Sequence, residues 1–211
     1  NEIKEYFKVV LKAMSLIDPE NASKTEFVGH GMLRFAEGKM RSRKGNVVTG
    51  ESLIHEIENE IYTKMEGRDI EEVDKKEIAT KVAIGAIKYT ILRQSIGKDI
   101  IFDREKSLSF EGDSGPYLQY ALVRSRSLLR KAEELGVVTS FETTPASSYN
   151  IEHVLYMFPE IIEKAWFEKS PHGIVEYLVK LCSEFNSFYG EGMIVSKEID
   201  SPYKLAIVKA F

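Results

Sequence analysis

The chain has 211 residues, of which 43% are hydrophobic and 29% charged, and its formal net charge is −4 at pH 7. The apolar content is enough to bury a core in one large or two small domains. The acidic balance argues against a protein that coats nucleic acid with its whole surface, and no run of about 20 apolar residues is present that could span a membrane.

The first residues predict a helix followed by a strand. Apolar side chains recur with helical spacing over residues 3–17, and the sequence DPENASK then breaks that pattern. The recurring side chains are Ile3, Phe7, Val10, Met14 and Ile17. Residues 25–35 are rich in β-branched and aromatic residues, which predicts a strand. The two glycines in this segment would weaken a strand unless another part of the molecule lies against its backbone.

Two helices are predicted next. Thr49 is suited to cap the first of them, with Glu51 in its first turn. The apolar face of this helix consists of Ile54, Ile57, Ile61 and Met65. A charged connection follows over residues 66–77, and residues 78–96 are apolar on most sides, which indicates a buried helix. Gly85 and Ala86 would let a neighbouring helix approach this one closely.

The second half of the chain is predicted to be helical. Residues 99–112 suggest two brief extended pieces, after which Asp113 or Ser114 caps a helix that ends at Gly136. Pro116 falls in its first turn, where a missing N–H costs little. A loop over residues 139–150 precedes two further helices and a last helical pattern. These helices are expected at residues 152–167, 173–189 and 202–211. The fold class is therefore α+β and mostly α.

The helix over residues 116–132 has two distinct faces. One stripe is apolar and is expected to face the helical bundle; it consists of Leu118, Leu122, Ser125, Leu129 and Ala132. A second stripe carries Tyr117, Tyr120, Arg124 and Lys131. Rings that stack on unpaired bases and cations that contact phosphates suit single-stranded RNA. The wheel alone favours a more ordinary interpretation, in which the tyrosines are half-buried against a neighbouring helix and the arginines are in solvent.

A basic segment precedes the helix that Thr49 caps. The sequence GKMRSRKG, residues 38–45, places cations between glycines and before a helix N-terminus, a combination typical of anion sites. The spacing of a P-loop is absent. From the residues alone, a solvated basic turn is an equally good interpretation.

Cysteine and histidine are too sparse to predict a disulfide or a metal site. Cys182 is the only cysteine and lies among apolar helical neighbours, which is typical of a buried, unreactive thiol in a cytoplasmic protein. The four histidines are scattered, and none has ligand spacing. We therefore expect no protein-bound metal.

Several segments resemble arginyl-tRNA synthetases in the order in which that family has them. They are GHGMLRFAEGKMRSRKGNVV, AIGAIKYTIL, IIFDREKSLSFEGDSGPYLQYALVRSRSLLRKA and EFNSFYG. The first is similar to the KMSKS region of class I aminoacyl-tRNA synthetases. The resemblance implies that residues 1–112 are the C-terminal part of a Rossmann-type catalytic domain with connecting helices. It also implies that residues 113–211 are most of an all-α anticodon-binding domain of the DALR type, truncated at its C-terminus.

The resemblance also implies an activity, which is ATP-dependent activation of arginine and its transfer to tRNA(Arg). The KMSKS-like loop, residues 38–47, would fold over the triphosphate, with Lys39 and Lys44 offsetting charge on the departing pyrophosphate. Arg41 departs from the small serine that is usual at its position. Further ATP contacts are implied for Met32, Met40, Ser42 and Arg43, with the backbone around His30 to Met32 near adenine.

For the C-terminal helices, the resemblance makes Tyr117 and Tyr120 candidates for stacking on anticodon bases. Arg124 and Lys131 would contact phosphates, and Tyr189 would line the same site. The expected partners are tRNA(Arg), arginine and ATP, the last with Mg²⁺, and the expected oligomeric state is a monomer.

The family's HIGH motif, amino-acid pocket and N-terminal tRNA-elbow domain would precede residue 1. We therefore expect residues 1–211 alone to be unable to form arginyl-adenylate. Two alternatives remain: a catalytically silent tRNA-binding module, and a helical interaction scaffold with no RNA role.

Overall fold

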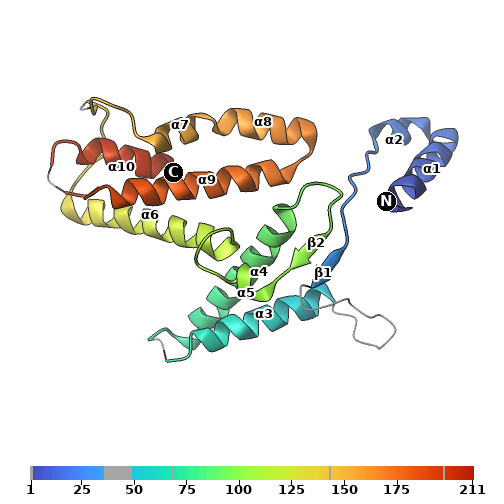
Figure 1. Cartoon of the computed structure of the whole chain (residues 1–211), viewed down its shortest axis with the longest axis horizontal. Coiled ribbons are helices and arrows are strands. Elements are labelled where there is room, and N and C mark those ends of the chain that lie inside the picture. Colours follow the sequence, from blue (N-terminus) through green and yellow to red (C-terminus); the bar gives the residue numbers. More distant parts are fainter. Residues whose placement is uncertain (1, 36–48, 68, 143, 197) are drawn as a thin grey trace.

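The computed structural model describes residues 2–35, 49–67, 69–142, 144–196 and 198–211. These residues form a mostly helical structure with one two-stranded sheet, as the sequence predicted. In Figure 1, helices α6 to α10 make a bundle on one side, helices α3 to α5 and the sheet lie centrally, and α1 and α2 lie on the opposite side. None of the helices in the described ranges is long and apolar enough to cross a membrane.

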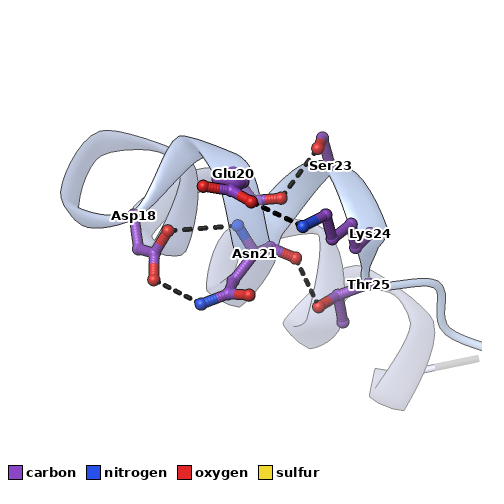
Figure 2. A network of polar contacts seen from close by, with 6 residues as sticks. All are labelled: Asp18, Glu20, Asn21, Ser23, Lys24 and Thr25. Carbon is purple, nitrogen blue, oxygen red and sulfur yellow. Dashed lines mark hydrogen bonds and ion pairs between the residues drawn. The ribbon is translucent and has the colours of Figure 1, made fainter.

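The predicted first helix is present as α1, Glu2–Ile17, but the break after it is a single residue. Asp18 caps a second helix, α2, Pro19–Lys24, which the sequence analysis did not predict. The carboxylate of Asp18 accepts hydrogen bonds from the backbone N–H of Asn21 (3.1 Å) and from its side-chain amide (2.6 Å), as Figure 2 shows. These hydrogen bonds lower the pKa of Asp18 because they stabilise its charged form.

The predicted strand over residues 25–35 is regular only at its end. Strand β1, Leu33–Phe35, pairs in parallel with β2, Ile100–Phe102, with Leu33 opposite Ile100. Within the described residues the pairing with β2 covers these three residues, and residues 25–32 are not in a strand. Gly31 lies directly against the backbone of the turn before β2, where an added Cβ would be 2.0 Å from the carbonyl oxygen of Lys98. This close approach is the reason that the sequence analysis anticipated for a glycine here.

Helices α3, Gly50–Lys64, and α4, Glu72–Leu92, form an antiparallel pair beside the sheet. The Thr49 side chain accepts a hydrogen bond from the backbone N–H of Ser52 (3.1 Å), which confirms it as the N-cap. Helix α4 begins inside the segment that was predicted to be a charged connection. The core between these elements contains Leu53, Ile57, Ile61, Met65, Ala79, Ala83, Ala86, Phe102 and Leu108. A single helical turn, α5, Arg104–Ser107, replaces the second extended piece.

The bundle consists of α6, Gly115–Leu135; α7, Asn150–Tyr156; α8, Phe158–Glu168; α9, Pro171–Gly190; and α10, Ser201–Ala210. The predicted ends of α6 are confirmed, with Ser114 as N-cap and Gly136 in the left-handed region at φ +67°. The single helix predicted over residues 152–167 is two helices, α7 and α8. Pro159 has no N–H to donate to the carbonyl of Leu155, so a continuous helix would lose that bond.

Phe185 of α9 is fully buried at the centre of the bundle core. On α6, the residues that face this core are centred on Ala121, Ser125 and Ala132, whereas Leu122, which was predicted to face it, is 42% exposed. The core needs small residues on α6 because α9 and α10 pack closely against it. Cys182 is buried in the same core, and burial raises the pKa of its thiol to about 12.

The bundle is joined to the central elements by a close contact between α4 and the start of α6. A Cβ added to Gly115 would lie 2.6 Å from the carbonyl oxygen of Gly85 and 2.9 Å from the Cα of Ala86. The close packing expected at Gly85 and Ala86 is therefore present. Beside it, Tyr89 of α4 donates a hydrogen bond to Asp113, and burial together with this bond raises the pKa of the tyrosine.

This contact predicts opposite effects for two glycine-to-alanine substitutions. Gly115→Ala should lower the free energy of unfolding by about 1–3 kcal/mol, because backbone atoms of α4 must move to accept the methyl group. Gly173→Ala is the matched control. It lies in α9 with nothing within 4 Å of the added Cβ, and should raise that free energy by roughly 0.5–1 kcal/mol. Chemical denaturation of the 211-residue chain measures both, and equal effects would contradict the packing argument.

Candidate nucleic-acid interface

Helices α6 and α9 run side by side in the bundle (Figure 1), and each carries an exposed tyrosine. Tyr120 belongs to α6 and is 46% exposed; Tyr189 belongs to the last turn of α9 and is 41% exposed. The sequence analysis proposed both as RNA contacts from separate segments. The structure brings them together at one place on the surface, on either side of a shared side chain.

That shared side chain is Arg124. Its Cζ atom lies 4.6 Å from the ring centroid of Tyr120 and 4.5 Å from that of Tyr189. At these distances the guanidinium is attracted by both rings. One terminal nitrogen also donates a hydrogen bond to the Tyr120 hydroxyl (2.7 Å), which lies one helical turn earlier on α6. Arg124 is therefore engaged within the protein, whereas the sequence analysis expected it to contact phosphate.

A residue that the sequence analysis did not single out completes the cluster. Asn186 of α9 accepts a hydrogen bond from Arg124 (2.9 Å) and donates one to the hydroxyl of Tyr117 (3.0 Å). A signal for it was present, because Asn186 lies one turn before Tyr189 in the segment EFNSFYG. It was missed because its partners are 62 and 69 residues away in the sequence.

Tyr117 differs from the other two tyrosines. Its ring packs against the bundle core and is partly buried, and its hydroxyl accepts the hydrogen bond from Asn186. Tyr117 is therefore a tyrosine half-buried against a neighbouring helix, which was the alternative that the helical wheel allowed. The ring that the structure presents to solvent on this part of α6 is that of Tyr120.

Positive charge extends from this cluster along α6. Lys131 is exposed and follows Arg124 by seven residues, which places it about 10 Å further along the same side of the helix. Arg126 and Arg130 are also exposed on α6, but at about 100° per residue they lie on the opposite side of the helix from Arg124. The arrangement therefore combines two exposed rings with an exposed cation, Lys131, on the same side of α6, which suits an unpaired strand whose bases stack and whose phosphates pass along the helix.

The residues of the predicted nucleotide site are mostly not described. Lys39, Met40, Ser42, Arg43 and Lys44 lie outside the described residues, so their roles stay predictions. Met32 is described. Its backbone N–H donates to the carboxylate of Asp99 (3.0 Å), its carbonyl accepts from the N–H of Ile100 (2.9 Å), and its residue surface is 68% exposed. A nucleotide contact would therefore come from the Met32 side chain.

We found no group of three or more histidine, cysteine, aspartate or glutamate side chains suited to hold a metal ion in the part of the chain that the structure describes.

Two protein-family models match this chain. Residues 2–104 match the family model of the class I (R) tRNA synthetase catalytic domain, and residues 118–211 match that of the DALR anticodon binding domain. The predicted division between residues 112 and 113 falls between the two matches.

The arginine–tRNA ligase of Treponema denticola is 36% identical over 208 residues, which are 94% of this chain and 35% of that protein. That of Clostridium acetobutylicum is also 36% identical, over 97% of this chain and 37% of the relative. The solved structure of Thermus thermophilus arginyl-tRNA synthetase superimposes with a TM-score of 0.74 at 26% identity, over 95% of this chain and 35% of that one. The chain spans about a third of the length of these relatives. It belongs to the arginyl-tRNA synthetase family and contains part of the catalytic domain together with the anticodon-binding domain of that family.

Proposed function

We propose that this chain is part of an arginine–tRNA ligase, in which α6 and α9 bind the anticodon and residues 38–47 act at the ATP site. The observation that carries the RNA part is the pair of exposed rings, Tyr120 and Tyr189, beside Arg124 on helices within the anticodon-binding match. The relatives named above are arginine–tRNA ligases, which supports tRNA(Arg) as the partner.

The physical basis of RNA binding is stacking combined with charge. Unpaired bases stack on aromatic faces with about 1–3 kcal/mol each, and lysine or arginine side chains contact the phosphates between them. Tyr120 and Tyr189 offer the faces, and Lys131 offers a cation along α6. Tyr117 is assigned a supporting role because its hydroxyl and ring are engaged inside the protein.

The proposal for ATP rests on the family match and on the place of the basic segment in the chain. Residues 38–47 follow strand β1 and precede α3, whose capped N-terminus carries partial positive charge. Lys39 and Lys44 would stabilise the negative charge that develops on pyrophosphate as arginine is activated, and Mg²⁺ would accompany the ATP. Met32, Met40, Ser42 and Arg43 are proposed as further ATP contacts. We also propose that the enzyme is a cytoplasmic monomer.

The first test is the stacking role of Tyr120. Tyr120→Ala should weaken binding of an RNA stem-loop with the tRNA(Arg) anticodon by roughly 5- to 150-fold, because one stacked base is lost. Val123→Ala, an exposed aliphatic position on the same helix, is the matched control and should bind like the parent. Fluorescence anisotropy with a labelled stem-loop measures both. Equal affinities for the parent and Tyr120→Ala would remove the stacking proposal, whereas no binding of the stem-loop by the parent would favour a scaffold without an RNA role.

A second test concerns the cation on α6. Lys131→Ala should reduce the slope of log affinity against log salt concentration by about 0.7, as expected when one contact to a single-stranded phosphate is lost. Lys164→Ala, an exposed lysine on α8, should leave the slope unchanged. An unchanged slope for Lys131→Ala would show that phosphates do not pass this residue.

A third test requires a full-length enzyme that contains this chain. Lys39→Ala should slow arginine-dependent pyrophosphate exchange by about 10²-fold or more if the lysine stabilises charge in the transition state. Lys64→Ala, an exposed lysine at the end of α3, is the control for loss of a positive charge. A rate that Lys39→Ala leaves unchanged would show that the basic segment is incidental to catalysis, as the scaffold alternative holds.

A further inference from the structure

We propose that Asn186 is the positioning residue of the anticodon interface, because its side-chain amide holds the Arg124 guanidinium between the rings of Tyr120 and Tyr189. The RNA-binding consequence of this proposal rests on the proposed function, whereas the arrangement of the side chains does not. Asn186 is partly buried, and its amide lies between a side chain of the bundle core and one at the surface.

The orientation of the amide follows from the chemistry of its partners. Arginine has only donors, so the oxygen of Asn186 must face Arg124, at 2.9 Å. The amide nitrogen then has to donate to Tyr117, whose hydroxyl lies 3.0 Å away and acts as the acceptor. Because the Tyr117 ring packs against the bundle core, this hydroxyl is a fixed point.

The hydrogen bonds therefore run from the core to the surface through one amide. Asn186 connects Tyr117 to Arg124, and Arg124 in turn donates to the hydroxyl of Tyr120 at 2.7 Å. An arginine on a helix surface otherwise samples many rotamers, at a considerable entropic cost when it is held in one. The amide selects the rotamer that places the flat guanidinium against both rings, at 4.6 and 4.5 Å.

The consequence for RNA is preorganisation. Tyr120 and Tyr189 come from different helices, and the guanidinium fills the space between them and supports a face of each. Bases can then stack on the exposed surfaces of rings that are already in place, without the cost of ordering them on binding. On this view Arg124 supports the rings, and the phosphates are contacted by other cations.

The experiment combines a readout without RNA and a readout with it. In NMR spectra of the 211-residue chain, the side-chain Nε–Hε signal of Arg124 should be displaced by the ring currents of the two tyrosines. Asn186→Ala should return this signal toward the position of a solvent-exposed arginine. Ser187→Ala, the adjacent exposed residue of α9, should leave it unchanged. Alanine has the highest helix propensity, so α9 should persist in both variants, which circular dichroism checks.

With the anticodon stem-loop as the probe, Asn186→Ala should lower the affinity by about tenfold, since a hydrogen bond to a charged group is lost and the rings are no longer held. The slope of log affinity against log salt concentration should stay the same, because no phosphate contact is removed. Tyr117→Phe should produce a smaller change in the same direction. It removes only the acceptor that orients the amide.

Three results separate the possible failures. An Arg124 signal that is unchanged in Asn186→Ala overturns the positioning role, whatever happens to RNA binding. A fall of about 0.7 in the slope of log affinity against log salt concentration in Asn186→Ala also overturns it, because this would show that Arg124 contacts a phosphate. If the parent chain does not bind the stem-loop while the Arg124 signal responds as expected, the proposed function fails and the side-chain arrangement stands.

Discussion

The contact of Gly115 with Gly85 and Ala86 is the constraint on which the relation between the two halves of this chain depends. Helix α6, which is 21 residues long, begins at that contact, against α4 of the central elements, and runs from there into the bundle. Because no side chain separates the two backbones at this point, a larger residue at position 115 would push α6 away from α4. Tyr120 and Arg124 follow Gly115 by five and nine residues on the same helix, so their place relative to α4 depends on this contact.

The cluster around Arg124 illustrates how the same residue types serve two roles. A helical stripe of tyrosines and cations occurs both in RNA interfaces and in ordinary amphipathic helices, so the sequence pattern does not distinguish them. The structure divides the stripe into a ring anchored in the core, Tyr117, and a ring that is half-exposed, Tyr120, with an arginine that supports the exposed one. Tyr189 completes the arrangement from α9. We interpret this division as the physical basis of a binding surface that is formed before RNA arrives.

The family assignment and the structure support different parts of the proposal. The two family matches cover residues 2–104 and 118–211. The likeness to the solved structure of an arginyl-tRNA synthetase extends over 95% of the chain. The proposal for ATP depends on residues 38–47 and so rests on the match. The proposal for RNA depends on contacts between α6 and α9, which the structure describes directly.

By itself, the sequence determined the features that arise from interactions between residues close together in the chain. The caps Thr49 and Ser114 and the terminating Gly136 were predicted correctly, because capping satisfies backbone groups within one helical turn. Pro159 is also a local signal, because a proline interrupts a helix. The division between α7 and α8 could therefore have been predicted from the sequence.

Only the tertiary structure decided which side of each element is covered. It placed Ala121 in the core and left Leu122 exposed, because the face of α6 that is covered depends on where α9 and α10 pack against it. It left residues 25–32 of the predicted strand without a strand partner, and it joined Asn186 to partners more than 60 residues away. Contacts of this kind depend on how whole helices pack together. The residues that form such contacts show no periodic pattern in the sequence, so the sequence alone does not reveal them.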